Sequence, residues 1–336
     1  MAGQLFLKLN STARLIELIS CALRYFQHYF RQHFLTLHLS AVVAGSIKSP
    51  DDACQIRQFR HTDFSRGMSP VVLVDHFVMT GPSFGPHPHA GIGVATLLLE
   101  DSTGEMQSLE SIENNREIRA GDLHWTLAGK GIVHAQRPAG EARLHGLQIF
   151  IDLPEHAKAL PASTSLLRAW EMPVIQTVSG RIRVAAGSYG GWQSPLQIPE
   201  PLLILDGWLR PGASMLVTMQ PGWNAWIYAV QGDLGVRARH RSKGAAPLPK
   251  MAGGDPDFAV LPAGSAVAAG ATPDGEEGVL MLMAGRTPAH FVLISGPAAD
   301  VAAGSRGVST RAGQEALAQA LAAYEGAETV PQGVAM

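Results

Sequence analysis

From about residue 56 onward, the apolar residues of this 336-residue chain come in short runs that glycine and proline interrupt. In the run 147–153, leucine and isoleucine occupy every second position. Because successive side chains of a strand point to opposite faces, this alternation predicts a strand with one buried face. Similar short runs at residues 71–75, 93–99 and 121–127 predict further strands. Many short strands separated by turn residues favour an all-β fold.

A second series of short apolar runs begins near residue 182 and has the same rhythm as the first. Its expected strands lie at residues 202–205, 215–219, 224–230, 258–261, 279–283 and 291–294. Residues 154–173 lack a strand period and indicate a connector. Since 336 residues exceed a typical single domain, we expect two β domains, at residues 50–155 and 181–326, joined by a linker over residues 156–180.

Both ends of the chain have a helical period instead. Between residues 15 and 30, apolar residues recur every three or four positions with arginines and histidines between them, which predicts an amphipathic helix. We expect residues 1–45 to be a helical extension that the globular fold does not need; membrane-surface binding and organelle targeting are the alternatives. Near the other end, Leu317, Leu321 and Tyr324 share one helical face and predict a short closing helix.

Two segments about forty-five residues apart carry the histidines that suggest chemistry. His87 and His89 lie two residues apart, and so do His134 and Gln136. In extended strands each pair projects to one face, so on facing strands of a barrel three imidazoles and one amide oxygen converge. Imidazole suits Fe, Ni, Cu or Zn, and the alternative interpretation is a polar barrel lining without an ion. His290 stands alone, so we expect no metal in the second domain.

Composition excludes several classes of function. The net charge of −2 and the absence of aromatics from the densest basic run, residues 237–243, argue against direct nucleic-acid binding. The longest apolar run of the amino-terminal helix is too short to span a bilayer, so we expect no transmembrane segment. The two cysteines, Cys21 and Cys54, form no metal-binding or disulfide pattern, which suits a reducing cytoplasm.

The motifs around the histidines resemble those of the pirin family, in the cupin superfamily. The resemblance covers roughly residues 50–326 and is strongest in Pro-His-Pro-His-Ala-Gly at 86–91, in Ala-Gly-Asp-Leu-His-Trp-Thr-Leu-Ala-Gly-Lys-Gly-Ile-Val-His at 120–134 and in His-Gly-Leu-Gln at 145–148. It implies two antiparallel jelly-roll barrels in one chain, with a single metal, usually iron, in the amino-terminal barrel.

The resemblance also implies which residues hold the metal. It places ligands at His87, His89 and His134 and expects a glutamate where this chain has Gln136. A glutamine still offers a carbonyl oxygen but removes a negative charge beside the cation. Ala90 stands where an arginine is usual.

Two further positions near the motifs depart from the family pattern: Gly93 stands where a glutamate is usual and Asp101 where a glycine is common. Losing partners of the ligands weakens a metal site. Glu100 and Glu105 are the nearby carboxylates that would compensate, although both are expected to be solvated residues near a strand end.

Some pirins resemble flavonol dioxygenases, so the likeness implies a metal-dependent dioxygenase that acts on flavonols such as quercetin at a weakened site. The expected cofactor is one divalent transition metal, iron first, with Ni, Mn, Cu, Co and Zn as alternatives. A non-catalytic regulatory or protein-binding pirin, metal-poor or redox-sensing, is the second hypothesis. The sequence assigns no catalytic residue. A small aromatic substrate, a protein partner, a monomeric state and a cytoplasmic location complete the expectations.

Overall fold

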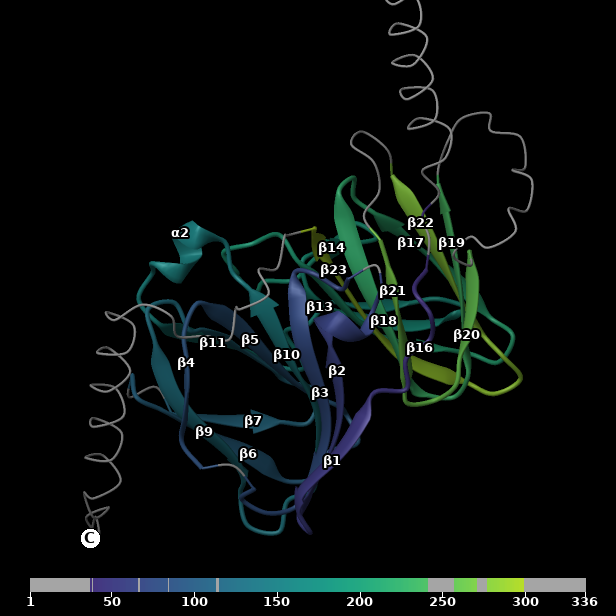
Figure 1. Ribbon diagram of the computed structural model, residues 1–336. Coiled ribbons are helices and arrows are strands. Elements are labelled where there is room, and N and C mark those ends of the chain that lie inside the picture. Colours follow the sequence, from purple (N-terminus) through teal and green to yellow (C-terminus); the bar gives the residue numbers. More distant parts are fainter. Residues whose placement is uncertain are drawn as a thin grey trace, which may run out of the picture. The chain divides into compact units, whose positions relative to one another are not determined.

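The computed structural model describes residues 37, 39–65, 67–83, 85–112, 115–240, 257–270 and 277–298 of the chain. Nearly all of its regular structure is β-strand, apart from the 3-10 turn η1 (His61–Asp63) and the short helix α2 (Glu155–Lys158) (Figure 1). All strand pairs in these residues are antiparallel. The expected all-β fold is therefore confirmed.

The first half of the chain forms a barrel from two facing sheets. A seven-stranded sheet has the order β1-β2-β3-β10-β5-β8-β11, and a four-stranded sheet has the order β4-β9-β6-β7. Their bounds are β1 (Ser46–Asp51), β2 (Cys54–Arg60), β3 (Val71–Met79), β4 (His87–His89), β5 (Ile92–Leu98), β6 (Glu105–Glu110), β7 (Arg116–Arg119), β8 (Leu123–Leu127), β9 (Ile132–Pro138), β10 (Leu144–Asp152) and β11 (Ser163–Leu167).

The second half forms a second barrel of the same kind. Its six-stranded sheet has the order β12-β13-β16-β23-β18-β21 and its four-stranded sheet the order β17-β22-β19-β20, with the hairpin β14-β15 beside them. Their bounds are β12 (Val174–Gln176), β13 (Gly180–Ala186), β14 (Ser188–Tyr189), β15 (Trp192–Gln193), β16 (Leu203–Leu209), β17 (Ser214–Met219), β18 (Trp223–Gln231), β19 (Leu234–His240), β20 (Phe258–Leu261), β21 (Ser265–Ala269), β22 (Gly278–Ala284) and β23 (Ala289–Pro297).

The interiors of the two barrels differ in polarity. Inside the second barrel, residues such as Val184, Leu205 and Ile227 form a fully buried apolar cluster. In the first barrel, the side chains of Gln148 and Thr96 reach across to the opposite sheet, where both donate hydrogen bonds to the amide oxygen of one buried glutamine. A barrel filled with apolar side chains leaves no polar group to bind a ligand, so the first barrel is the one that can hold a functional site.

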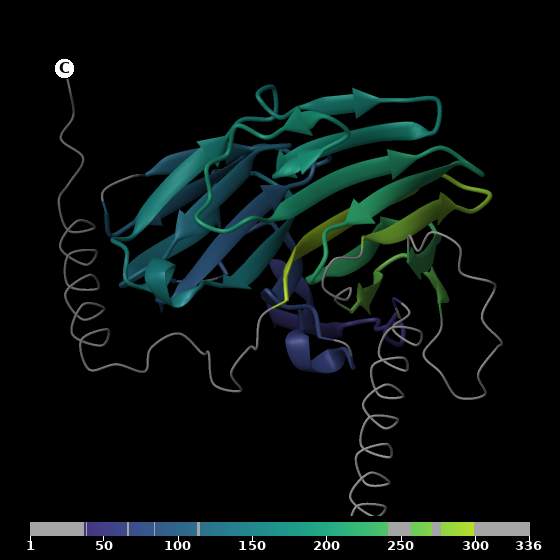
Figure 2. The ribbon, with the colours of Figure 1, turned by 90° about the horizontal axis from the view of Figure 1, so that it is seen from above.

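The two barrels share an apolar core. Leu147 and Ile149 of β10 point away from the first barrel's interior and pack in one buried cluster with Ile204 and Trp226 of the second barrel. The strands of the two halves lie side by side in Figure 1 and Figure 2. Strict alternation in β10 thus separates a face that lines the first barrel from a face that packs on the second.

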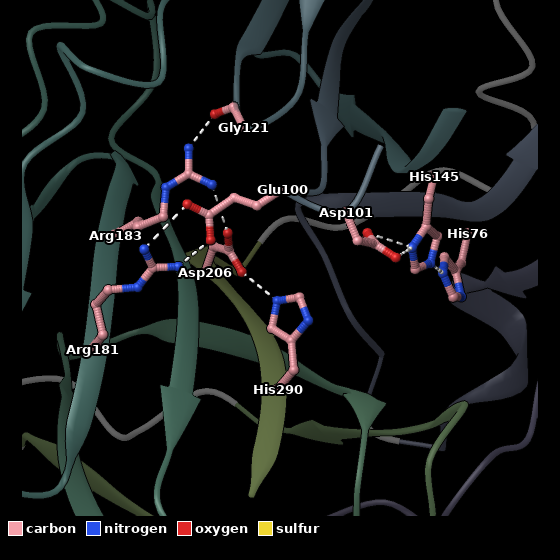
Figure 3. A network of polar contacts seen from close by, with 9 residues as sticks. All are labelled: His76, Glu100, Asp101, Gly121, His145, Arg181, Arg183, Asp206 and His290. Atoms are coloured by element: carbon pink, nitrogen blue, oxygen red, sulfur yellow. Dashed lines mark hydrogen bonds and ion pairs between the residues drawn. The ribbon is translucent and has the colours of Figure 1, made fainter. Parts of the chain in front are cut away.

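A buried ion cluster also joins the barrels (Figure 3). Asp206, on β16, accepts hydrogen bonds from Arg183 Nη1 at 3.0 Å and from His290 Nε2 at 2.6 Å. Arg183 also donates to the carbonyl of Gly121 in the first barrel. Burial alone would raise the pKa of Asp206, but the His290 hydrogen bond and the Arg183 charge outweigh it and hold the pKa below its usual value.

A chain of hydrogen bonds, the tyrosine–histidine chain, crosses the same boundary; Figure 3 shows its part from His76 through His145 to Asp101. It runs from the Tyr228 hydroxyl to His76 Nδ1 (2.5 Å), from His76 Nε2 to His145 Nε2 (2.6 Å), and from His145 Nδ1 to the carboxylate of Asp101 (2.7 and 2.8 Å). One arrangement of protons satisfies all of these contacts with neutral rings: each group donates to the next, and Asp101 accepts last.

The boundaries of the fold differ from the expected ones at two places. Leu37 and Leu39 are buried in the second barrel's core, and Val43 pairs with Ala266, so residues 37–45 belong to the globular fold. The expected linker contains two strands, β11 and β12, which extend the two large sheets. The expected amino-terminal helix and closing helix lie outside the described residues. Within the described part of the chain, no helix has the length and apolarity to cross a membrane.

Candidate metal centre

Two histidines and a glutamate lie in a row that crosses three neighbouring strands of the four-stranded sheet. In the antiparallel ladders, His87 of β4 is directly opposite His134 of β9, and His134 is directly opposite Glu110 of β6. Directly opposite residues project to the same face of a sheet. The two histidine segments were expected on facing strands, but they are adjacent strands of one sheet, which brings their side chains together equally well.

His87, His89 and His134 form a compact group of imidazoles. Their potential ligand atoms all lie within 4.8 Å of one another, and each pair of ring centroids is 4.8 Å apart. The rings stand nearly perpendicular, with interplanar angles of 68° to 90°. A divalent metal binds imidazole nitrogen at about 2.0–2.1 Å, so small movements of these side chains would bring three nitrogens within 4.8 Å of one another onto one cation.

The buried nitrogens of this group have no partner in the protein. Nε2 of His89 and both ring nitrogens of His134 are buried without a hydrogen bond. Nδ1 of His87 lies 3.0 Å from the carbonyl oxygen of Gly85, which can only accept, so Nδ1 carries the proton and Nε2 keeps a free lone pair. Buried polar atoms normally have partners, and a metal ion would satisfy these.

The surroundings keep His89 and His134 neutral. Burial, followed by the neighbouring His87, lowers the pKa of His89 to about 4. Burial and the neighbouring histidines likewise hold the pKa of His134 well below its usual value. A metal binds the neutral ring, so no proton has to be displaced from these two residues near neutral pH.

Gln136 faces the same interior as His134, but its amide is already engaged. Its Oε1 accepts hydrogen bonds from Thr96 Oγ1 at 3.2 Å and Gln148 Nε2 at 2.9 Å, and its Nε2 donates to Ser108 Oγ at 3.3 Å. A carbonyl oxygen offers two lone pairs, and both are used here. Metal binding through Gln136 would therefore compete with two hydrogen bonds.

The interior also contains a buried pair that sequence reasoning missed. The carboxylate of Glu110 and the imidazole of His124, on β8, are both fully buried, with Oε1 and Nε2 3.2 Å apart. For His124 a sequence signal existed, because Leu123, Trp125 and Leu127 alternate with it and leave it on the opposite face. The sequence of β6 has no such alternation and gave no sign that Glu110 points inward.

Two departures from the expected pattern lie away from the histidines. Ala90 packs with Val133 and Ala135, on the side of the small sheet opposite to His134. A Cβ atom at Gly93 would lie 2.5 Å from the ring of Trp125, so glycine makes room for this indole. Their effect on the ligands is therefore indirect.

The other nearby acidic residues are engaged elsewhere. Glu100 pairs with Arg181 of the second barrel, and Glu105 pairs with Arg119 at 2.7 Å. Asp101 accepts from His145 in the tyrosine–histidine chain. The expectation that Glu100 and Glu105 are surface residues agrees with these exposed ion pairs.

Two jelly-roll barrels in one chain, with a histidine group inside the first, define a bicupin. Residues 44–151 match the family model described as pirin. Human pirin is 32% identical over 170 residues, which cover 50% of this chain and 58% of that protein. Pirin-like protein 2 of Arabidopsis thaliana is 28% identical over 205 residues, 61% of this chain and 63% of that protein. Residues 44–151 are therefore similar to the pirin family, and the aligned part spans about three-fifths of the length of these relatives.

Solved structures share the fold at low sequence identity. Quercetin 2,3-dioxygenase from Acinetobacter baumannii superposes with a TM-score of 0.62 and 20% identity, over 78% of this chain and 87% of that one. The bacterial pirin YhhW of Escherichia coli, solved in complex with nickel(II), superposes with a TM-score of 0.55 and 17% identity, over 78% and 100% of the two chains. At these identities the likeness establishes the fold.

Proposed function

We propose that the protein is a metal-binding pirin in which His87, His89 and His134 hold one divalent transition metal. The observation that carries this proposal is a group of three imidazoles whose ligand atoms lie within 4.8 Å of one another, with the buried nitrogens of His89 and His134 lacking a partner in the protein. Iron is the first candidate, and Ni, Mn, Cu, Co and Zn are alternatives. We propose Gln136 as the fourth metal ligand. To bind the metal, its Oε1 would have to give up the hydrogen bonds that it accepts from Thr96 and Gln148.

The site is suited to a small aromatic substrate. The ring of Phe150 lies 5.7 Å from that of His89, and Ile92 and Val94 belong to the same apolar cluster. We propose dioxygenase activity on flavonols such as quercetin, with the first barrel as the site. When bound, the metal would act as a Lewis acid that binds the flavonol oxygens and orients the substrate toward dioxygen.

A neutral amide at position 136 limits this activity. A flavonol must lose a proton to bind as an anion, and Gln136 has no useful basicity, so turnover is expected to be slow near neutral pH. The same observation favours the second candidate, a regulatory or protein-binding pirin whose metal serves structure or redox sensing. Monomeric state and cytoplasmic location stay predictions.

The first experiment is elemental analysis of protein purified without a chelating tag, followed by reconstitution with each metal and a quercetin assay. Near-stoichiometric metal that is lost in a His89→Ala variant supports the proposed site, and oxygen-dependent loss of quercetin absorbance supports the dioxygenase. Metal binding without turnover favours the regulatory candidate. Failure of the wild-type protein to take up any of the six metals would refute the proposed site.

A further inference from the structure

Glu110 is a buried carboxylate with an unsatisfied oxygen. Its side chain is fully buried inside the first barrel. Oε1 accepts a hydrogen bond from Ser108 Oγ at 3.2 Å and lies 3.2 Å from His124 Nε2, whereas Oε2 has no partner. Among the described residues, no lysine or arginine forms an ion pair with Glu110. A carboxylate removed from water is costly unless it is paired and hydrogen-bonded, so Oε2 calls for a donor or a cation.

The register places Glu110 beside one of the proposed metal ligands. Glu110 and His134 are directly opposite in the β6–β9 ladder, as His134 and His87 are in the β9–β4 ladder. Directly opposite Cβ atoms in such a ladder are about 4.5–5.5 Å apart. His134 is thus flanked by His87 on one side and by Glu110 on the other.

The unsatisfied atoms on the two residues complement each other. Both nitrogens of His134 lack a partner, and a metal ion would occupy only one of them. A metal-bound histidine almost always donates its other N–H to a carboxylate, a carbonyl or a water. Oε2 of Glu110 is an acceptor without a donor on the same face of the sheet.

The charge balance of the metal site also points to Glu110. The three histidines and Gln136 are a neutral donor set, because a metal binds the neutral form of imidazole and a glutamine amide carries no charge. A dication held by neutral donors alone in a buried site has no charge compensation. Glu110 is the nearest buried carboxylate in the ladder that carries His134.

We infer that Glu110 is the positioning carboxylate of the metal centre, the acceptor for the His134 N–H that faces away from the ion and the source of the negative charge that Gln136 does not supply. This inference rests on the metal site proposed above. His124, on the opposite sheet, lies 3.2 Å from Oε1 on the other side of the carboxylate and competes with His134 for it.

The test compares Ni²⁺ affinity, measured by competition with a chelator, in the wild-type protein and four variants. Glu110→Gln keeps the shape of the side chain and removes the charge. Glu105→Gln, in the exposed pair at the other end of β6, is the matched control. The double variant Glu110→Gln with Gln136→Glu returns a carboxylate to the site, and His124→Gln removes the other partner of Glu110.

We expect Glu110→Gln to bind Ni²⁺ about 10–100-fold more weakly, the usual effect of losing a partner of a ligating histidine. The double variant should regain most of that affinity, and Glu105→Gln should match the wild-type protein. His124→Gln should bind at least as tightly as the wild-type protein, because it frees the carboxylate. The visible spectrum of bound Co²⁺ should change in Glu110→Gln and not in Glu105→Gln.

If Glu110 serves only as the structural ion-pair partner of His124, the opposite results are expected. In that case, metal-free Glu110→Gln unfolds at lower urea concentration while its Ni²⁺ affinity is unchanged, and this result would overturn the inference. Equal weakening in Glu110→Gln and His124→Gln would overturn it too, even if Glu110→Gln folds poorly. If the wild-type protein binds no metal, both the proposed function and this inference are refuted. If the wild-type protein and Glu110→Gln bind Ni²⁺ equally tightly, only the inference is refuted.

Discussion

Acidification should weaken the contact between the barrels through His76. Burial, followed by the neighbouring His145, lowers the pKa of His76 to about 3, whereas in an unfolded chain a histidine titrates near 6.5. Arg57 and His290 add to the depression and Asp101 opposes it. Between these two pKa values the unfolded chain binds a proton that the folded chain does not, so the free energy of unfolding falls as pH falls.

The magnitude follows from the same shift. Each pH unit below 6.5 costs about 1.4 kcal/mol per such group, so His76 alone should remove about 2 kcal/mol of stability between pH 7 and pH 5. The His76→Gln variant cannot make this contribution. Its free energy of unfolding should therefore fall by about 2 kcal/mol less than that of the wild-type protein over the same interval.

The assay is urea unfolding at pH 7, 6 and 5 with a chelator present, so that bound metal contributes nothing. Histidines that do not contact His76 contribute equally in both proteins and cancel in the difference. His156→Gln is the control, because His156 is 70% exposed and should leave the wild-type pH dependence unchanged. Equal losses of stability in the wild-type protein and His76→Gln would refute the assignment of a buried, neutral His76.

Three more predictions concern packing, charge and metal. Gly93→Ala should lower the free energy of unfolding by about 1–3 kcal/mol, because the new Cβ would lie 2.5 Å from the Trp125 ring. Gly85→Ala is the control, because a Cβ there meets no atom within 4 Å and should leave the free energy of unfolding unchanged. Equal effects of the two substitutions in urea unfolding would contradict this prediction. Asp206→Ala should cost about 3–5 kcal/mol by leaving the Arg183 guanidinium buried and unpaired, and a loss below about 1 kcal/mol in the same assay would contradict it. Free Ni²⁺ at 100 times its dissociation constant should stabilise the wild-type protein by about 2.7 kcal/mol, measured by calorimetry as a rise in Tm that a chelator reverses; an unchanged Tm despite bound metal would count against it.

The sequence predicted those features that depend on local alternation. The strand around Leu147 and Ile149, and the common face of His87 and His89, follow from the two-residue period alone. The strands β11 and β12 were missed because proline and polar residues surround them. Their place is set by pairing with β8 and β13, which no local pattern reveals.

Contacts between strands that are far apart in the chain could not be predicted from the sequence. Glu110 lies in a strand without apolar alternation, so its inward orientation depends on the β6–β9 register. His290 stands alone in the sequence, yet in the structure it is buried and has a carboxylate partner 84 residues away. The Tyr228–His76 contact joins residues 152 positions apart, a separation over which sequence spacing carries no information.

The apolar core shared by the barrels sets a limit on how this protein can be divided. The family match ends at residue 151, within β10 and before β11 completes the seven-stranded sheet. A fragment cut there would expose the outer face of that sheet, including Val74, Leu97 and Leu147, all fully buried in the whole protein. Exposed apolar patches of that kind promote aggregation. The barrel that carries the histidines therefore matches a family model by itself, yet the outer face of its large sheet is kept from water by the second barrel.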